Sequence, residues 1–500
     1  MKINDILNEI NVISSYIPEE INEYAVLSLC HDSRRATREC AFFCKSGAVA
    51  DGHLFAPAAY ENGARIFIAE HELDLPPDAA VIITPNTNAA LNTLAVKFYN
   101  NPAKELKIVG ITGTKGKTTV AVSAYKIAVA NGLNAGYIGT NGIYYCGKQF
   151  ETVNTTPDTL ELQKTLRNMR NEGVTTVMLE VSSQALWQDR TFGLEFDSCV
   201  FTNLYSDHVG GVEHPTAEHY RDSKKKLFEA YKTNRIIVNS DSYVAKYMIK
   251  DANCGEIITT SANADRSCDL YATDIRQFKK GTIPGVAFKL NFKGLNPFDA
   301  FIPVPGKYNV ENALLVISIC TSLGIDLQKA IGDLSTLSVP GRFESLELSS
   351  KPGVLFIIDY AHNGASLESV IRALKDYSPK RIICLFGSVG GRTQGRRAEL
   401  GHVAGELADV LIITSDNPNY EDPMGVIRNI RDAVGNTDKP VYEIPDRKDA
   451  IKKAIEIARA GDYVLLAGKG HENYQLIQGR HIPFSERRIL EEFDLAYQPV

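Results

Sequence analysis

The segment at residues 107–119 most constrains how this 500-residue chain can fold. The apolar run Lys107–Ile111 predicts a buried strand, and a helix is expected from about Thr118 until Gly132 stops it. The sequence GITGTKGKTT occupies residues 110–119 between them. A loop placed between a strand and a helix N-terminus presents backbone N–H groups and the positive end of the helix dipole to a phosphate. The segment therefore predicts an α/β domain with a phosphate-binding loop.

The residues of this loop suit a nucleoside triphosphate. Gly113 and Gly116 allow close approach of the backbone, Lys117 can reach the β- and γ-phosphates, and the Thr118 hydroxyl can bind Mg²⁺. The strict pattern GxxxxGK[ST] is missed by one position, because Ile111 stands where its first glycine belongs. A glycine-rich turn that binds no nucleotide is the alternative, but the strand–loop–helix context favours ATP. The predicted ATP-binding residues of the loop are Gly113, Thr114, Lys115, Gly116, Lys117, Thr118 and Thr119.

The composition excludes several other classes of protein. The chain has 54 Lys and Arg against 60 Asp and Glu, a net charge of −6, without the basic excess of a nucleic-acid-binding protein. No apolar run reaches the ~18 residues of a membrane helix, and residues 1–20 are too charged for a signal peptide. Nine cysteines without a CxxC pair indicate reduced thiols. We expect a cytoplasmic monomer with small-molecule substrates and with neither nucleic acid nor a membrane as partner.

The chain is long enough for about three domains at ~150 residues each. Strands and helices alternate in each third of the chain, and breaks at Asn-Asn-Pro (100–102) and Val-Pro-Gly (339–341) separate the stretches. The predicted domains are residues 1–103, 104–338 and 339–500. The second is expected to hold a parallel α/β sheet with a less regular, strand-rich insert at 255–304. The third has a Rossmann-like pattern, but no GxGxxG follows its first strand, so a dinucleotide is not expected there.

Glu180 is a candidate ligand for the Mg²⁺ that accompanies ATP. It follows the predicted strand Thr176–Leu179, at the end where parallel sheets place ligands, and Mg²⁺ prefers hard oxygen donors. A solvated carboxylate at a strand end is the alternative. His208 and Lys224 stay open from the residues alone, since a lone His is more often structural and the KKK run at 224–226 is typical of a solvated helix face.

Short motifs between residues 32 and 472 occur in the order found in one family. They are DSR (32–34), DGHLF (51–55), TGTKGKTT (112–119), NTTPD (154–158), EVSS (180–183), TNL (202–204) with DH (207–208), GRFE (341–344), DYAH (359–362), DNP (416–418) and GKGHE (468–472). With them the chain resembles the Mur ligases, ATP-dependent amide-forming enzymes of peptidoglycan precursor synthesis that are related to folylpolyglutamate synthases. DGHxF, NTTPD, DNP and GKGHE together resemble the MurE type, which adds the third peptide residue.

The resemblance implies a three-domain architecture with a UDP-substrate-binding N-terminal domain, a central P-loop-type ATPase domain and a Rossmann-like C-terminal domain that binds an amino acid. It implies that Lys117, Glu180, His208 and Lys224 are catalytic. It also implies that Thr118, Glu180, His208 and Lys224 hold metal, with Lys224 carbamylated to N6-carboxylysine. Further ATP contacts are implied for Asn309, Asn312, Arg342, Asp359 and His362, although Asn309 and Asn312 could also only cap a helix. The implied UDP-substrate residues are Ser33, Arg34, His53, Thr155, Thr156, Ser182, Gln188 and Arg190.

The incoming amino acid is left open by the sequence. Members of the family that use meso-diaminopimelate have an Arg after DNP that reads the distal carboxylate, whereas this chain has Asn419 there. We expect a diamino acid, L-lysine or meso-diaminopimelate, and a neutral amino acid remains open. The implied amino-acid-binding residues are Arg392, Asp416, Asn417, Asn419, Gly468 and Glu472. Gly364, Gln184 and a shortened loop before Arg392 also depart from the family pattern.

The expected function is ATP-dependent addition of this amino acid to UDP-N-acetylmuramoyl-L-alanyl-D-glutamate through an acyl phosphate, with ATP and Mg²⁺ as cofactors. One alternative is a Mur-like ligase that adds another amino acid or acts on another acceptor, such as a folate. The other is a nucleotide-binding paralogue without catalysis, for which a broken Lys117, Glu180, His208 or Lys224 would be expected, and all four are intact.

Overall fold

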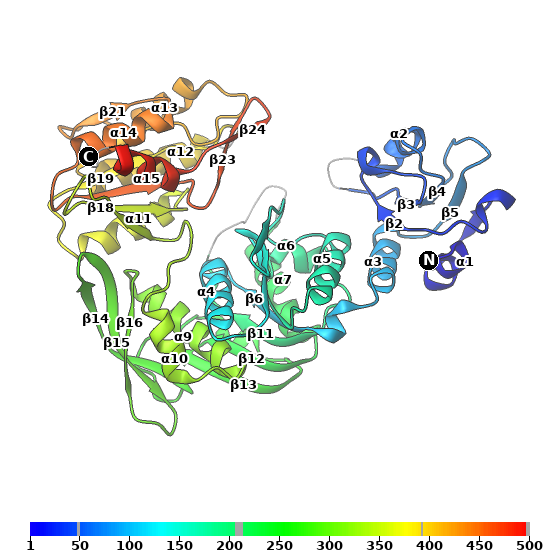
Figure 1. Cartoon of the computed structure of the whole chain (residues 1–500), viewed down its shortest axis with the longest axis horizontal. Helices are drawn as coiled ribbons and strands as arrows, with labels where there is room; N and C mark the ends of the chain where they lie inside the picture. Colours follow the sequence, from blue (N-terminus) through cyan, green and yellow to red (C-terminus); the bar gives the residue numbers. More distant parts are fainter. Residues whose placement is uncertain (48–50, 206–213, 392–393, 497–500) are drawn as a thin grey trace. The chain divides into compact units, whose positions relative to one another are not determined.

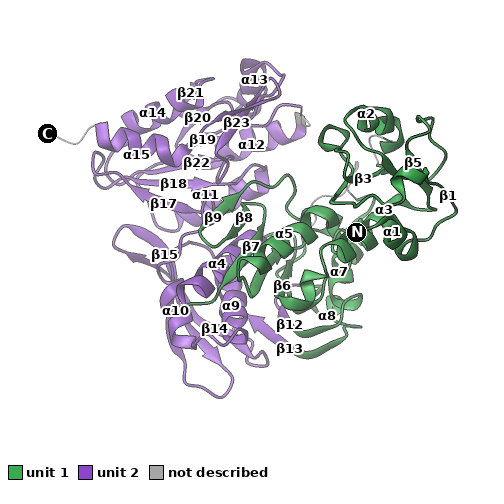
Figure 2. Ribbon diagram, turned by 45° about the vertical axis from the view of Figure 1, so that its right-hand side comes forward, with its two compact units in different colours: residues 1–115, 132–236, 244–257 green, residues 116–131, 237–243, 258–500 purple. Residues whose placement is uncertain are grey.

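The computed structural model describes residues 1–47, 51–205, 214–391 and 394–496. The described chain forms three α/β sheets and one separate two-stranded hairpin (Figure 1). By contacts it divides into two compact units, residues 1–115, 132–236 and 244–257, and residues 116–131, 237–243 and 258–500 (Figure 2). Among the helices in these ranges, none is both long and apolar enough to cross a membrane.

The first sheet has five strands in the order β1-β5-β4-β3-β2. Its elements are β1 (Ser14–Tyr16), β2 (Ser28–Cys30), β3 (Cys40–Phe43), β4 (Ile66–Ala69) and β5 (Ala80–Ile83), with α1 (Ile3–Glu9), α2 (Ala56–Glu61) and α3 (Thr87–Phe98). In β4 the side chains of Ile66 and Ile68 join one hydrophobic cluster and that of Phe67 joins another. Because both of its faces are buried, β4 is continuously apolar, as is usual for strands of parallel sheets.

The second sheet has eleven strands in the order β16-β15-β14-β13-β12-β11-β6-β10-β7-β8-β9. The strands are β6 (Lys107–Thr112), β7 (Ala135–Gly139), β8 (Gly142–Tyr145), β9 (Lys148–Phe150), β10 (Thr176–Glu180), β11 (Phe196–Phe201), β12 (Thr233–Asn239), β13 (Cys254–Ser261), β14 (Leu270–Lys280), β15 (Ile283–Phe292) and β16 (Phe298–Ile302). The helices are α4 (Lys117–Ala130), α5 (Thr159–Asn171), α6 (Ser183–Trp187), α7 (Ala217–Glu229), α8 (Ala245–Met248), α9 (Lys307–Ser322) and α10 (Leu327–Leu334).

Strand β6 pairs in parallel with both β10 and β11, so the carboxyl ends of these three strands meet at one edge. The predicted parallel pairing is confirmed for these central strands, and both flanks of the sheet hold antiparallel pairs that were not predicted. Strands β7, β8 and β9 pair antiparallel, as do β14, β15 and β16 of the predicted strand-rich insert. The short turns between these flanking strands permit hairpins, whereas a parallel neighbour would need a crossover of a dozen or more residues.

The third sheet has six strands in the order β17-β18-β22-β19-β20-β21. The strands are β17 (Glu344–Glu347), β18 (Leu355–Asp359), β19 (Ile382–Phe386), β20 (Val410–Ile413), β21 (Val441–Glu443) and β22 (Tyr463–Ala467), and the hairpin is β23 (Tyr474–Ile477) with β24 (Arg480–Pro483). The helices are α11 (Gly364–Lys375), α12 (Gln394–Leu407), α13 (Pro423–Val434), α14 (Arg447–Ile457) and α15 (Glu486–Ala496). All pairs except β17–β18 are parallel, which confirms the α/β class expected for this part of the chain.

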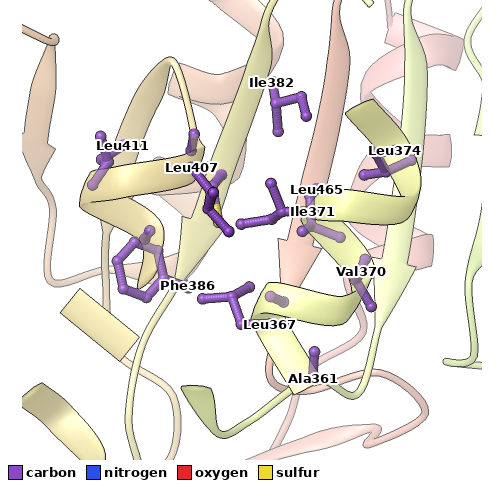
Figure 3. Packing of buried hydrophobic residues seen from close by; sticks show 14 of the residues in the cluster. Ala361, Leu367, Val370, Ile371, Leu374, Ile382, Phe386, Leu407, Leu411 and Leu465 are labelled. Carbon is purple, nitrogen blue, oxygen red and sulfur yellow. The ribbon is translucent and has the colours of Figure 1, made fainter. Parts of the chain in front are cut away.

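Alternate residues of the third sheet fill two cores. Leu465 of β22 packs in the cluster that also holds Leu367 and Ile371 of α11 (Figure 3). The neighbouring Val464 and Leu466 lie in the opposite cluster, with residues of α14 and α15. The three sheets fall within the three predicted domain ranges, and the exact boundaries remain predictions.

We predict that Leu465→Ala destabilises the third sheet by about 2–5 kcal/mol, because it removes a fully buried side chain and leaves a cavity. Urea unfolding followed by circular dichroism, with hydrogen exchange of β19 and β22, measures the change. Leu495→Ala is the matched control, since Leu495 is 69% exposed in α15, and its effect should stay within about 0.5 kcal/mol. Equal stability of the two variants would contradict the core assignment.

Candidate functional site

The first half of the phosphate loop is held by two residues that follow β11. The carbonyl of Asn203 accepts a hydrogen bond from the Thr114 N–H at 2.9 Å, and its Oδ1 accepts one from the Lys115 N–H at 2.9 Å. The Asn203 Nδ2 and the Thr202 hydroxyl both donate to the Lys115 carbonyl, at 3.1 and 2.6 Å. The loop is therefore fixed by the strand next to the one that it follows.

Both predicted glycines of the loop have backbone conformations that favour glycine. Gly113 has φ +148° and Gly116 has φ +86°. A Cβ on Gly116 would collide with Oδ1 of Asn312, whose Nδ2 in turn donates to Oδ1 of Asn309 at 3.3 Å. The structure thus brings the two predicted asparagines of α9 together and places one against the loop. The first turn of α4 comprises Lys117, Thr118 and Thr119.

Glu180 ends β10 and is fully buried. Its Oε1 accepts hydrogen bonds from the Tyr137 hydroxyl at 2.6 Å and the Thr140 N–H at 3.0 Å, and its Oε2 accepts one from the Thr140 hydroxyl at 3.3 Å. Burial, and then the nearby Glu180 carboxylate, raise the pKa of Tyr137 well above its ordinary value, so Tyr137 acts as a neutral donor. A Cβ at Gly139 would collide with both groups. The alternative of a solvated strand-end carboxylate is wrong.

Lys224 is 1% exposed, although it belongs to a run of three lysines on α7. Its Nζ donates to the Gly113 carbonyl at 2.9 Å and lies 4.5 Å from the centre of the Tyr220 ring. The Tyr220 hydroxyl donates to Oγ1 of Thr114 at 3.1 Å. Lys224 therefore does not lie on a solvated helix face, and it contacts the same loop that is expected to bind phosphate.

Most of the predicted UDP-substrate residues form one cluster beside Glu180. Arg190 donates to the Thr156 carbonyl at 3.1 Å and, through Nε and Nη2, to Oε1 of Gln188 at 3.0 and 2.7 Å. The Thr156 hydroxyl donates to the Glu180 carbonyl at 2.8 Å and accepts from the Ser182 N–H at 3.0 Å. Oγ1 of the remaining member, Thr155, lies 3.0 Å from the Thr140 hydroxyl.

The three predicted residues near the first sheet lie in two separate 3₁₀ helices, Ser33–Arg35 and Gly52–Phe55. Ser33 and Arg34 lie in a short 3₁₀ helix, where the exposed Arg34 binds both carboxylate oxygens of Asp32 at 2.9 and 2.8 Å. That hydrogen bonding from Arg34, against some desolvation, lowers the pKa of Asp32 to about 2.

His53 is buried, and both of its ring nitrogens are engaged. Nδ1 lies 2.6 Å from Asp51 Oδ1, and Nε2 accepts the Glu70 N–H at 2.9 Å. Asp51, His53 and His71 offer donor atoms within 4.8 Å of one another, but the lone pair of Nε2 is already used, so these residues do not suit a metal ion. A role of His53 in binding substrate stays a prediction.

Two segments of the third domain, residues 342–343 and 359–362, contact each other at the residues predicted to close over ATP. The Asp359 carboxylate accepts the Phe343 N–H at 2.8 Å, and the guanidinium carbon of Arg342 lies 4.8 Å from the Tyr360 ring centre. Burial raises the pKa of Asp359, although Arg342 opposes the shift. Burial also lowers the pKa of His362, so its ring is neutral near neutral pH. The Tyr360 ring also packs against His362, with centres 4.7 Å apart.

Four of the predicted amino-acid-binding residues follow the carboxyl ends of β20 and β22: Asp416, Asn417, Gly468 and Glu472. The Asn417 Nδ2 donates to Oε2 of Glu472 at 2.9 Å, and Lys469 bonds to both side chains. Gly468 has φ +112°, and a Cβ there would lie 2.9 Å from the Asp416 carboxylate. The structure thus brings these predicted residues together around a lysine that the sequence analysis did not select.

Asn419 is held by the β23–β24 hairpin. It has φ +53°, its N–H donates to the Leu476 carbonyl at 2.9 Å, and its carbonyl accepts the Gln478 N–H at 2.8 Å. Its Oδ1 accepts the Gly479 N–H at 2.9 Å. Two other predicted residues, His208 and Arg392, lie outside the described residues. Tyr137, Thr140, Asn203, Tyr220 and Lys469 contribute to the site but were not among the predicted site residues.

Three family descriptions match successive parts of the chain: the Mur ligase family, catalytic domain, at residues 26–102; the Mur ligase middle domain at 111–320; and the Mur ligase, glutamate ligase domain, at 341–470. A UDP-N-acetylmuramoyl-L-alanyl-D-glutamate--2,6-diaminopimelate ligase of Clostridium botulinum is 37% identical over 498 residues, which cover 98% of this chain and 99% of that protein. The chain belongs to the Mur ligase family.

Other comparisons agree with this assignment. The ligase of the same name from Geobacillus thermodenitrificans is 36% identical over 473 residues, covering 93% of this chain and 94% of that protein. A solved structure with this ligase name is 28% identical, covers all of both chains and has a TM-score of 0.68. A MurF ligase from Thermotoga maritima in complex with ADP has a TM-score of 0.62 at 18% identity, over 95% of this chain and 98% of that one, and shows the fold alone. The expected three-domain Mur ligase architecture is confirmed.

We predict a pH-dependent contribution to stability from His31 and Asp158, the residue that caps α5. Their side chains lie 3.0 Å apart. The hydrogen bond to Asp158 raises the pKa of His31, and although burial opposes it, the bond from His31 lowers the pKa of Asp158 to about 2. Because the pKa of His31 is raised in the folded protein, the pair stabilises the fold fully at pH values below the unfolded pKa of about 6.5. This stabilisation is lost as the pH rises through the folded-state pKa.

The thermal unfolding midpoint of His31→Asn should therefore fall further below that of the wild type at pH 6 than at pH 9. The variant leaves the Asp158 cap in place, because the bond from the Glu161 N–H to Asp158 does not involve His31. An equal difference at both pH values would rule out the charged pair.

Proposed function

We propose that this Mur ligase joins an amino acid to UDP-N-acetylmuramoyl-L-alanyl-D-glutamate with the hydrolysis of ATP to ADP and phosphate. The observation that carries the proposal is the 37% identity over 98% of the chain to a ligase of that name. The described part of the site supports it, since Glu180 and Lys224 are buried and Lys224 donates to the Gly113 carbonyl of the phosphate loop. We further propose that the reaction takes place in the cytoplasm, where ATP is available.

The residues of the site fit Mg²⁺ and the triphosphate of ATP. Mg²⁺ prefers oxygen ligands, and Glu180 offers a buried carboxylate at the same sheet edge as the phosphate loop. Thr118, Glu180, His208 and Lys224 would hold the metal. ATP supplies the phosphoryl group that makes the free carboxylate of the UDP-linked dipeptide a good acyl donor, and Mg²⁺ offsets the charge of that group.

The chain itself would orient the groups that react. Thr155, Thr156, Ser182, Gln188 and Arg190, together with Ser33, Arg34 and His53, would hold the UDP-linked substrate. Tyr137 and Thr140 fix the Glu180 carboxylate by hydrogen bonds, so that this ligand need not reorganise during the reaction. Arg342, Asp359 and His362 would close over ATP with the third domain. Carbamylation of Lys224 would give α7 an oxygen donor in place of a cation beside the phosphate loop.

The amino acid would bind at Arg392, Asp416, Asn417, Asn419, Gly468 and Glu472. Glu472 carries a carboxylate that can pair with the ammonium of the incoming amino acid, whatever its side chain. Asn419 offers no charge to a distal carboxylate, and its Oδ1 is engaged by Gly479. The named relatives act on 2,6-diaminopimelate. We propose a diamino acid, L-lysine or meso-diaminopimelate, as the substrate.

The test is phosphate release by the purified full-length chain with ATP, Mg²⁺, UDP-N-acetylmuramoyl-L-alanyl-D-glutamate and one amino acid at a time. L-lysine, meso-diaminopimelate, L-ornithine and L-alanine form the panel, and mass spectrometry identifies the product. We expect release with at least one diamino acid and a muramoyl tripeptide of matching mass. Absence of release with every amino acid would refute the ligase proposal.

We predict that Lys224→Ala lowers the rate of phosphate release about 100-fold or more, because it removes a charged group at the phosphate-binding site. Added formate or acetate should restore part of the rate by supplying the missing oxygen donor. Lys225→Ala is the matched control, since the neighbouring Lys225 bonds to Asp251 at 3.1 Å and pairs with Glu229, and it should keep nearly full activity. A fully active Lys224→Ala enzyme would disprove the carbamate role.

A further inference from the structure

Lys469 is a lysine whose side chain is completely buried in a loop between two glycines. Its Nζ donates to Oδ1 of Asn417 at 2.9 Å and to Oε2 of Glu472 at 2.8 Å, and lies 3.5 Å from Oδ1 of Asp416. A buried ammonium is costly unless it is paired and hydrogen-bonded, and these three side chains provide that compensation. Lys469 therefore bonds to residues of two different loops, those after β20 and after β22.

The contacts of Lys469 determine which way the Asn417 amide faces. Oδ1 of Asn417 accepts both the Lys469 ammonium and the Leu476 N–H, the latter at 2.9 Å, while its Nδ2 donates to Glu472. If the amide were flipped, its NH₂ group would face two other donors and the carbonyl would face a carboxylate. The orientation is therefore unique, and Lys469 is one of the two donors that impose it.

The Glu472 carboxylate is oriented by the same lysine. Oε2 accepts hydrogen bonds from both Lys469 and Asn417, whereas in the described part of the chain Oε1 accepts none. The Glu472 side chain is 16% exposed, against 3% for Asp416. One edge of the carboxylate is thus fixed inside the protein and the other is left for a ligand.

A second buried cation holds the backbone below this cluster. Arg447 donates to the Ser415 carbonyl at 3.1 Å and to the Ala467 carbonyl at 2.8 Å, the residues immediately before Asp416 and Gly468. Its charge is balanced by Glu486, at 2.8 Å. The backbone of the two loops is therefore supported without Lys469, so Lys469 acts on the side chains of Asn417 and Glu472.

We propose that Lys469 is a positioning residue for the incoming amino acid, an inference that rests on the proposed ligase function. Its ammonium fixes the Asn417 amide and the Glu472 carboxylate in the arrangement that binds the amino end of the substrate. Two carboxylates, Asp416 and Glu472, share this one ammonium, so the cluster keeps an excess of negative charge. That excess complements an ammonium group of the incoming amino acid.

The test is steady-state phosphate release by full-length Lys469→Met, with each of the three substrates varied in turn. We expect the KM for the amino acid to rise about 10- to 100-fold, as the loss of hydrogen bonds to charged groups implies, and the KM values for ATP and the UDP-linked dipeptide to change less than about twofold. Lys439→Met is the matched control. The Lys439 Nζ also donates to two groups of the third domain, the carbonyls of Gly405 and Glu406, at 2.6 and 3.0 Å. This variant should leave all three KM values unchanged.

Lys469→Arg decides the question if Lys469→Met does not fold. It keeps a cation among the carboxylates, but the planar guanidinium cannot reproduce the contacts of a compact ammonium, so the KM for the amino acid should still rise selectively. Equal changes in all three KM values, or none, in a folded Lys469 variant would overturn the inference while leaving the ligase proposal intact. A wild-type chain that releases no phosphate with any amino acid would overturn the ligase proposal itself, and this inference with it.

Discussion

The parallel pairing of β6 with β10 and β11 is the constraint on which the central site depends. It brings three strand ends to one edge, and each end contributes a different group: the phosphate loop after β6, the Glu180 carboxylate at the end of β10, and Thr202 with Asn203 after β11. The loop would otherwise have to satisfy its own backbone polar groups. Here Thr202 and Asn203, which follow the neighbouring strand, bond to the backbone groups of Thr114 and Lys115.

Buried cations recur where the chain has to hold loops in place. Lys224, Arg447 and Lys469 are each 1% exposed or less, and each is bonded to backbone carbonyls or to carboxylates. A charge that is taken out of water must find compensation inside the protein, and a long cationic side chain with several donors can find it on two loops at once. Arg447 bonds in this way to the backbone of two loops, and Lys469 bonds to side chains of two loops.

The fold was largely predictable because its signals are local. The strand Lys107–Thr112, the helix from Lys117 to Ala130 and the phosphate loop between them can be identified from apolar runs and glycines a few residues apart. The antiparallel flanks of the central sheet were not predicted. A short apolar run does not tell which neighbour it pairs with or in which direction.

The supporting residues of the site could not be found in the same way. Tyr137 bonds to Glu180 across 43 positions of the chain, and Lys469 bonds to Asn417 across 52. In the sequence Gly-Lys-Gly, a lysine resembles a solvated loop residue, and no local pattern signals that it is buried. Lys224 posed the same difficulty within its run of lysines, and only the resemblance to a family selected it.

The attachment of Asn419 to the β23–β24 hairpin ties substrate choice to folding. Its N–H, carbonyl and Oδ1 all bond to the hairpin, and its left-handed backbone conformation is one that Asn tolerates better than most residues. Replacing it by Arg to gain a charge for a distal carboxylate would remove the Gly479 bond and add backbone strain. A change of amino-acid preference in this chain would therefore need compensating substitutions in the Gln478–Gly479 turn. The residue that selects the amino acid and the turn of the hairpin would have to change together.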